Sequence, residues 1–250
     1  MKVIDSHVNI SENGDWFNTG LKASYQDICY RLDDSDIYKA VLVSMPGVCS
    51  NAFYYKANID RDRFWLFGNI DFNYIKKSME EVIDLNLDGI KIHPRFQKIT
   101  ICDLLKTEIF ERFNELSIPV MICGWQQSSS IPIDDLSPLH IDKIAKKFKN
   151  VPIILTHLGG FRFWDAYTVA RSNSNVFLDC SYILNVFSGT SIVSDFFKLL
   201  PQIDQKILYG SDYPEVNIFE YKDKFIKNIS HINKLKQENI LHRNISNLLK

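Results

Sequence analysis

The chain has 250 residues, of which 46% are hydrophobic and 24% are charged, and its 29 Lys and Arg residues nearly balance 30 Asp and Glu residues. This composition is typical of soluble globular proteins and excludes disordered, collagen-like and coiled-coil chains. A formal net charge of −1 provides no cationic surface for nucleic acid or for an anionic membrane. We therefore expect neither nucleic acid nor a membrane among its partners.

The cysteines and the N-terminal segment indicate the cellular compartment. The five cysteines form no CxxC pair, which argues against a disulfide framework. Asp5 and His7 interrupt the N-terminal segment before any apolar stretch of signal-peptide length. No apolar run approaches the roughly 20 residues that a membrane span needs. We therefore expect a cytoplasmic protein.

Short β-branched runs alternate with longer segments of helical period, as in parallel sheets built from βαβ units. The intervening segments carry apolar stripes at helical spacing, such as Ile141, Ile144 and Ala145. Eight strand–helix pairs in a chain of this length fit a single (β/α)8 TIM-barrel domain over residues 1–250 better than an open doubly wound sheet. The predicted strands are Val3–Ile10, Ala40–Pro46, Phe64–Asp71, Gly89–Pro94, Val120–Trp125, Ile153–Leu158, Val176–Tyr182 and Ile207–Asp212.

Polar residues gather where four of these strands end, which is where TIM barrels carry their active sites. Because several ionisable groups are costly to bury together without a role, we expect His7, His93, His157 and Asp212 to converge around one cavity. The strand-end residues are Asp5, Ser6, His7 and Asn9; Lys91, His93 and Arg95; Thr156 and His157; and Ser211 and Asp212.

Other polar residues are expected to lie outside the chemistry. We expect Lys91 to be an inward structural lysine that is paired with Asp5 or Asp179. The remaining histidines have polar neighbours in predicted helices or loops and are predicted to lie at the surface. They are His140, His231 and His242.

Six segments, in this order and spacing, resemble the amidohydrolase superfamily, in particular the amidohydrolase-related group that includes aminocarboxymuconate-semialdehyde decarboxylase. The resemblance spans nearly the whole chain and implies a barrel of the metal-dependent hydrolase kind. The segments are Ile4–Asn9 (IDSHVN), Gly89–Pro94 (GIKIHP), Pro152–Gly160 (PIILTHLGG), Asn175–Asp179 (NVFLD), Leu208–Pro214 (LYGSDYP) and Ile240–Leu249.

The resemblance also implies a divalent metal, usually zinc, held by two strand-one histidines, a strand-five histidine and a strand-eight aspartate, with a catalytic strand-six histidine. His7 and Asp212 match metal ligands, and Asp212 and His157 match catalytic residues. Asn9 and Cys123 stand where two further histidines belong. We therefore expect a degenerate or absent metal site, with Asn9, Cys123 or His157 as further ligands. Cys123 is either a thiolate ligand or a small buried hydrophobic residue.

Two chemical routes follow from these residues. With a metal, Asp212 orients or deprotonates the metal-bound water and His157 polarises the carbonyl under attack. Without a metal, Asp212 is the general base on an unbound water while His157, with His93 or Arg95, stabilises the oxyanion. The second route suits an activated ester or a lactone.

Four residues are expected to bind the substrate. Arg95 and Arg162 can hold a carboxylate through two parallel hydrogen bonds. Trp125 can form a wall for a ring-shaped molecule, and His93 completes the set.

The leading hypothesis is a hydrolase of a small, carboxylate-bearing or cyclic ester or lactone. A decarboxylase of the same group is the alternative enzyme. An inactive barrel that binds a small ligand is the alternative outside enzymes. A small molecule is the expected partner. The sequence does not fix the oligomeric state, and a homo-oligomer is one alternative.

Overall fold

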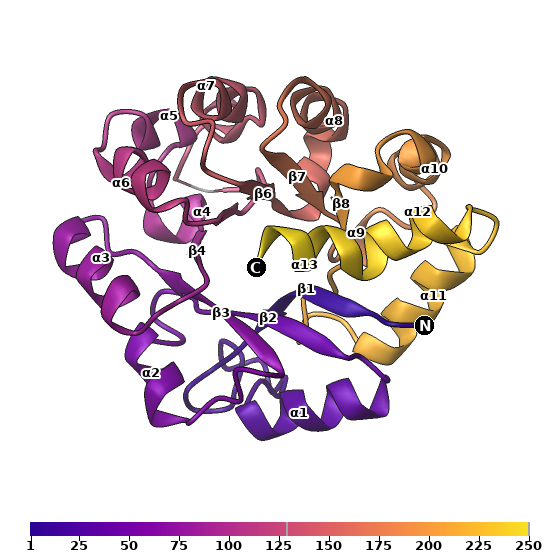
Figure 1. Cartoon of the computed structure of the whole chain (residues 1–250), viewed down its shortest axis with the longest axis horizontal. Helices are drawn as coiled ribbons and strands as arrows, with labels where there is room; N and C mark the ends of the chain where they lie inside the picture. The colour runs from indigo at the N-terminus through magenta and orange to yellow at the C-terminus, as the bar shows by residue number, and fades with distance from the viewer. Residues whose placement is uncertain (129, 250) are drawn as a thin grey trace.

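The computed structural model describes residues 1–128 and 130–249, and it contains a barrel of eight parallel strands. The strands follow one another around the ring in chain order, and each pairs in parallel with the next (Figure 1). The prediction of a TIM barrel is therefore confirmed. The strands are β1 (Ile4–Asn9), β2 (Lys39–Val43), β3 (Phe64–Asn69), β4 (Gly89–Ile92), β5 (Val120–Ile122), β6 (Ile153–Leu155), β7 (Val176–Asp179) and β8 (Ile207–Leu208).

The ring closes through backbone hydrogen bonds between β1 and the segment that continues β8. Ser6 N donates to the carbonyl of Tyr209 at 2.8 Å, and Asn9 N donates to the carbonyl of Tyr213 at 2.8 Å. Asp212 N donates to the carbonyl of His7 at 2.9 Å. Three residues predicted to belong to the site, His7, Asn9 and Asp212, therefore form part of the seam that closes the barrel.

Helices surround the ring on its outer side (Figure 1). Their apolar stripes face the strands, as the buried residues Ile141, Ile144 and Ala145 show. No helix among the described residues is long and apolar enough to cross a bilayer. The helices are α1 (Tyr25–Asp34), α2 (Asn51–Lys56), α3 (Ile75–Asp84), α4 (Pro94–Gln97), α5 (Ile101–Leu104), α6 (Ile109–Leu116), α7 (Leu139–Lys147), α8 (Phe163–Ser172), α9 (Ile183–Val186), α10 (Ser191–Leu199), α11 (Ile218–Ile229), α12 (Lys234–Glu238) and α13 (Asn244–Leu248).

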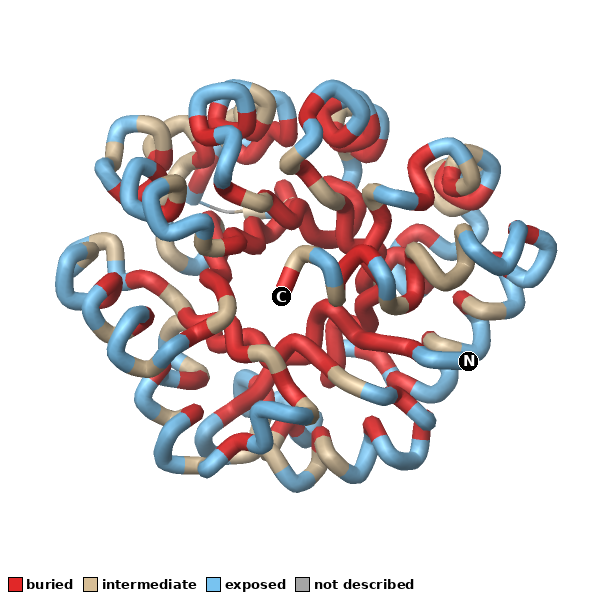
Figure 2. Tube along the Cα trace, in the orientation of Figure 1, coloured by how far each residue is buried: buried red, intermediate tan, exposed pale blue. Residues whose placement is uncertain are grey.

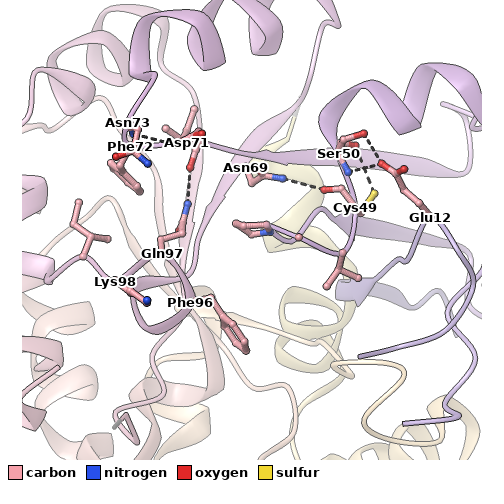
Figure 3. A pocket seen from close by; sticks show the side chains of 15 residues that line it. Glu12, Cys49, Ser50, Asn69, Asp71, Phe72, Asn73, Phe96, Gln97 and Lys98 are labelled. Atoms are coloured by element: carbon pink, nitrogen blue, oxygen red, sulfur yellow. Dashed lines mark hydrogen bonds between the residues drawn. The ribbon is translucent and has the colours of Figure 1, made fainter. Parts of the chain in front are cut away.

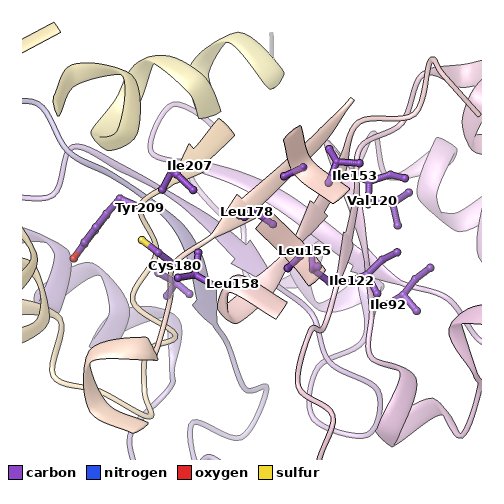
Figure 4. Packing of buried hydrophobic residues seen from close by; sticks show 14 of the residues in the cluster. Ile92, Val120, Ile122, Ile153, Leu155, Leu158, Leu178, Cys180, Ile207 and Tyr209 are labelled. Atoms are coloured by element: carbon purple, nitrogen blue, oxygen red, sulfur yellow. The ribbon is translucent and has the colours of Figure 1, made fainter. Parts of the chain in front are cut away.

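The core has an outer and an inner layer. The outer layer packs strands such as β5 to β7 against the helices, and Figure 4 shows Ile122, Leu155 and Leu178 within it. The inner layer fills the barrel and includes Ile245 and Leu249, which lie in or just after α13. Figure 2 shows the strands buried and the outer helix faces exposed. The C-terminal helix thus closes one end of the barrel and leaves the other end for the site.

The observed strands lie within the predicted runs apart from Lys39 at the start of β2, but several end earlier than predicted. β6 stops at Leu155 and β8 stops at Leu208. Beyond these points the backbone takes left-handed conformations, with φ of 56° at His157 and 73° at Asp212. The polar residues that follow therefore turn over the barrel mouth instead of continuing the sheet.

Candidate active site

A cavity of about 370 Å³ opens at the C-terminal ends of the strands. The structure brings to it residues that lie as far apart in the chain as β1 and the segment after β8. Because parallel strands end at one rim, these distant segments meet there. The predicted site residues that line the cavity include His7, His93, Arg95, Trp125, His157 and Asp212.

His7 lies at the centre of this arrangement, and its two ring nitrogens have different surroundings. Nδ1 lies 3.0 Å from Oγ of Ser181 and 3.6 Å from Oδ1 of Asp179. Nε2 lies 3.3 Å from Nζ of Lys91 and 3.4 Å from Oδ1 of Asp212. Burial, followed by the charge of Lys91, lowers the pKa of His7, so the imidazole is held neutral. The expected direct pairing of Lys91 with an aspartate is wrong, because its ammonium contacts this imidazole.

The sequence analysis named Asp179, the last residue of β7, only as a possible partner of Lys91, and it missed Ser181, which follows β7. Oγ of Ser181 donates to Oδ1 of Asp179 and lies 3.1 Å from Nδ1 of His157. Oγ of Ser6 donates to Oδ2 of Asp179 at 2.6 Å. Burial raises the pKa of Asp179, but the hydrogen bonds of His7 and Ser181 and the charge of His157 outweigh burial, and the pKa falls below its usual range. Asp179 is therefore a buried carboxylate anion beside His7, and Ser181 bonds to both Asp179 and His157.

Gly210 explains how the Asp179 carboxylate reaches this position. A Cβ atom at Gly210 would lie 2.1 Å from Oδ2 of Asp179 and 2.9 Å from Oγ of Ser6. Such separations are far inside van der Waals contact. The close approach of backbone and carboxylate therefore requires glycine here.

His7, His157 and Asp179 together form a candidate metal site. One ligand atom from each lies within 4.8 Å of the others, and all three residues are buried. Two imidazoles and a carboxylate are donors that zinc and other first-row divalent ions accept. Ser181 and Ser6 supply the outer hydrogen bonds that orient such ligands. The donor set fits a divalent metal, which counts against the prediction of a degenerate site.

The metal donors differ from the predicted set. Among the described residues, Asn9, Cys123 and Asp212 are not members of the group of three. Nδ2 of Asn9 donates to Oδ1 of Asp212 at 2.9 Å and to the carbonyl of Tyr213 at 3.0 Å. Asn9 thus holds the Asp212 carboxylate at the cavity wall.

Cys123 follows β5 and lies between His93 and His157. Burial raises the pKa of its thiol, but the charges and hydrogen bonds of the two histidines outweigh burial and bring the pKa well below its ordinary value. Burial opposes the charged form of His157, but Asp212 and Cys123 outweigh it and raise the pKa of His157. Cys123 is also buried, so its assignment as a thiolate or as a small buried hydrophobic residue stays a prediction.

Two nitrogens at the cavity have no partner among the described residues. They are Nδ1 of His93 and Nε of Arg95, and both atoms are buried. Arg95 also donates from Nη1 to the carbonyl of Gln127 at 3.2 Å, which fixes its side chain. Buried polar groups are normally satisfied, and these two nitrogens are free to bond to a ligand.

Aromatic side chains stand on two sides of the cavity. The rings of Phe17 and Phe96 stack with their centroids 5.4 Å apart. Trp125 on the other side lies 5.2 Å from Phe161 and 6.1 Å from Tyr182, centroid to centroid. The cavity therefore offers flat apolar surfaces next to its charged groups.

Arg162 does not join the cavity lining among the described residues. Its Nε donates to Asp165 at 2.6 Å, and its Nη1 donates to Asp134 at 2.7 Å. The guanidinium is thus engaged by two carboxylates on the outer surface. The expectation that Arg162 holds a substrate carboxylate is not supported by this position.

A larger cavity of about 740 Å³ lies beside the site and shares Phe96 with it (Figure 3). Its polar side chains bond to the cavity's own walls. Ser50 N donates to Glu12 at 2.7 Å, and Nδ2 of Asn69 donates to the carbonyl of Cys49 at 3.2 Å. The unpartnered nitrogens of His93 and Arg95 lie at the smaller cavity, which is therefore the better candidate for chemistry.

One histidine predicted to lie at the surface has a defined partner. Nδ1 of His140 lies 3.1 Å from Sγ of Cys102, and its Nε2 lies 3.0 Å from the carbonyl oxygen of Asp134. His140 is half-buried, as is His242, whereas His231 is exposed. All three histidines thus keep some surface exposure.

A family model described as amidohydrolase matches residues 4–244. The comparison with curated proteins found no match. Among solved structures, an uncharacterized TIM-barrel protein of Bordetella bronchiseptica is 20% identical, with a TM-score of 0.86 and coverage of 100% of this chain and 98% of that chain.

Two further solved structures have named activities. A probable 2-pyrone-4,6-dicarboxylic acid hydrolase of Acinetobacter baumannii, with citric acid bound, is 16% identical, has a TM-score of 0.70 and covers 100% and 99% of the two chains. A 2,6-dihydroxybenzoate decarboxylase of Rhizobium is 14% identical, has a TM-score of 0.71 and covers 100% and 98%. At these identities the likeness shows the shared fold alone.

Proposed function

The chain belongs to the amidohydrolase family, and from this premise we propose that it is a hydrolase of a small ester or lactone that carries a carboxylate. The proposal treats residues 1–250 as one catalytic domain, because the site needs residues from both ends of the chain. It rests above all on Asp212, a carboxylate that lines the cavity and is held by Asn9 beside two histidines.

Asp212 is proposed as the general base. Its Oδ1 atom accepts the hydrogen bond from Asn9, so the carboxylate is oriented before substrate arrives. A base fixed in this way takes a proton from the attacking water as the new carbon–oxygen bond forms. Without a bound metal, the raised pKa of His157 supports a role as the charged donor that stabilises the developing oxyanion. With a metal bound, His157 would instead be a neutral imidazole ligand.

His7, His157 and Asp179 would hold a divalent metal in this proposal. Bound there, the ion would act as a Lewis acid and make water a better nucleophile near neutral pH. Ser181 and Ser6 keep the three donors oriented through their hydrogen bonds. The identity of the metal is part of what the experiment below determines.

The unpartnered nitrogens of His93 and Arg95 support the proposal that the substrate carries a carboxylate. A guanidinium binds a carboxylate through directional, charge-assisted hydrogen bonds. Trp125 and the Phe17–Phe96 pair would pack on a flat ring. The citric acid bound to the Acinetobacter baumannii protein is likewise a small carboxylic acid.

The test is a screen of esters, lactones and carboxylated rings, with acid release and CO2 release measured separately. We expect acid release by the wild type and a loss of about 10²- to 10⁴-fold in kcat for Asp212→Asn. Glu215→Gln is the matched control, because Glu215 lines the same cavity but accepts a hydrogen bond from Nε1 of Trp16 at 2.7 Å. It should retain turnover within a few-fold.

Three outcomes contradict the proposal. Release of CO2 without acid production would make the protein a decarboxylase. Ligand binding without turnover under any added metal would make it a binding protein. Equal turnover by Asp212→Asn and the wild type would remove Asp212 as the base.

A further inference from the structure

Lys91 is a cation enclosed within the barrel. It lies in the middle of β4 with 1% of its surface exposed, and its Nζ contacts Nε2 of His7 at 3.3 Å. Burial lowers the pKa of Lys91 below its ordinary value, while the charges of Cys123, Asp212 and Asp179 favour the ammonium and that of Arg95 opposes it. This ammonium sits directly beside a proposed metal ligand.

The partners of His7 determine which nitrogen carries the proton. Nε2 of His7 lies 3.3 Å from Nζ of Lys91 and 3.4 Å from Oδ1 of Asp212. The ammonium only donates and lies nearer, so we take Nε2 to accept from Lys91 through its lone pair. The proton of the neutral ring is then on Nδ1, which donates to Oγ of Ser181, and Ser181 donates in turn to Asp179. Lys91 and Asp179 are thus a buried cation and anion joined through an imidazole and a hydroxyl.

We infer that Lys91 is a built-in cation of this site that competes with a divalent metal for His7. The hydrogen bond from Lys91 occupies the free lone pair of His7, and the proton on Nδ1 blocks the other nitrogen. The ammonium also repels a second cation across a low-dielectric interior. Metal loading therefore requires Lys91 to give up its contact with His7.

This inference goes beyond the proposed hydrolysis and holds whether or not esters are turned over, because it concerns metal binding alone. Full-length protein freed of metal with a chelator is titrated with Zn²⁺ or Mn²⁺ in a calorimeter. Lys91→Met keeps the length of the side chain and removes the charge. We expect it to bind the ion at least tenfold more tightly than the wild type.

Lys98→Met is the matched control, since Lys98 follows α4 and is exposed. It should bind metal as the wild type does. Lys91→Gln is the second variant. It keeps a hydrogen-bond donor for His7 but removes the positive charge, so it separates the effect of the charge from that of the hydrogen bond. Equal or weaker metal binding by folded Lys91→Met and Lys91→Gln, with folding checked by circular dichroism, would overturn the inference.

Two measurements on the wild type do not depend on any variant. Nitrogen-15 NMR should find His7 protonated at Nδ1 and bare at Nε2 in the metal-free protein. The opposite tautomer would overturn the inference. Intact mass should equal the sequence mass, whereas an added 44 Da, the mass of CO2, at Lys91 would make it an anion and would also overturn it.

Discussion

Nδ2 of Asn9 lies 2.9 Å from Oδ1 of Asp212, so an amide at the end of β1 orients the carboxylate that follows β8. Asn9→Ala removes this donor, and hydrogen bonds to charged groups are worth about 1.5–3 kcal/mol. We expect kcat to fall about 10- to 100-fold with little change in KM, measured on the best ester of the screen. Asn9→His, which restores an N–H donor, should recover much of the loss. Unchanged kcat in Asn9→Ala would show that Asp212 needs no such support.

Arg95 is expected to select substrates that carry a carboxylate. Arg95→Met should raise KM for the acid substrate about 10- to 100-fold, because a charge-assisted contact is lost. KM for a neutral methyl ester of the same ring should change little. Arg162→Met is the control, since its guanidinium is bonded to Asp134 and Asp165 outside the cavity. Equal effects of the two variants would contradict the assignment.

The buried carboxyl of Asp5 is expected to make the stability of the protein depend on pH. Burial raises the pKa of this carboxyl to about 7 in the folded protein, whereas an unfolded aspartate has a pKa of about 3.9. Between these values the folded state binds more protons than the unfolded state, so stability falls as pH rises from about 4 to about 7. The full loss is about 4 kcal/mol at 1.36 kcal/mol per unit of pKa.

Asp5→Asn isolates this effect. Urea unfolding of chelator-treated protein at a series of pH values should give a flatter profile for Asp5→Asn than for the wild type between pH 4 and 7. Above pH 7 both profiles should run parallel, because Asp5 has finished titrating. Parallel profiles across the whole range would show that Asp5 ionises normally in the folded state.

Gly210 is expected to control the Asp179 end of the metal site. In Gly210→Ala the new methyl group would displace the Asp179 carboxylate from Ser6. We expect at least tenfold weaker Zn²⁺ or Mn²⁺ binding and a loss of about 1–3 kcal/mol in the free energy of unfolding. Ser6→Ala, which removes the same hydrogen bond without crowding, should weaken metal binding in the same direction. If both variants bound the metal with wild-type affinity, Asp179 would not be one of the metal donors.

The fold could be predicted from the alternation of apolar runs because a parallel barrel repeats one local pattern eight times. The convergence of His7, His157 and Asp212 followed from their places at strand ends. The partners of Lys91 could not be predicted, because contacts across the barrel interior depend on which inward-pointing side chains lie in the same layer. The role of Asp179 at the site was missed because it arises from Ser181, Ser6 and Gly210 acting together.

The seam between His7 and Asp212 ties the site to folding itself. The first and last strands can meet only after the chain through Asp212 has been synthesised, so a nascent or truncated chain that stops before Asp212 has no assembled active centre. Ligands that favour the assembled centre would then also favour the native state over the unfolded ensemble.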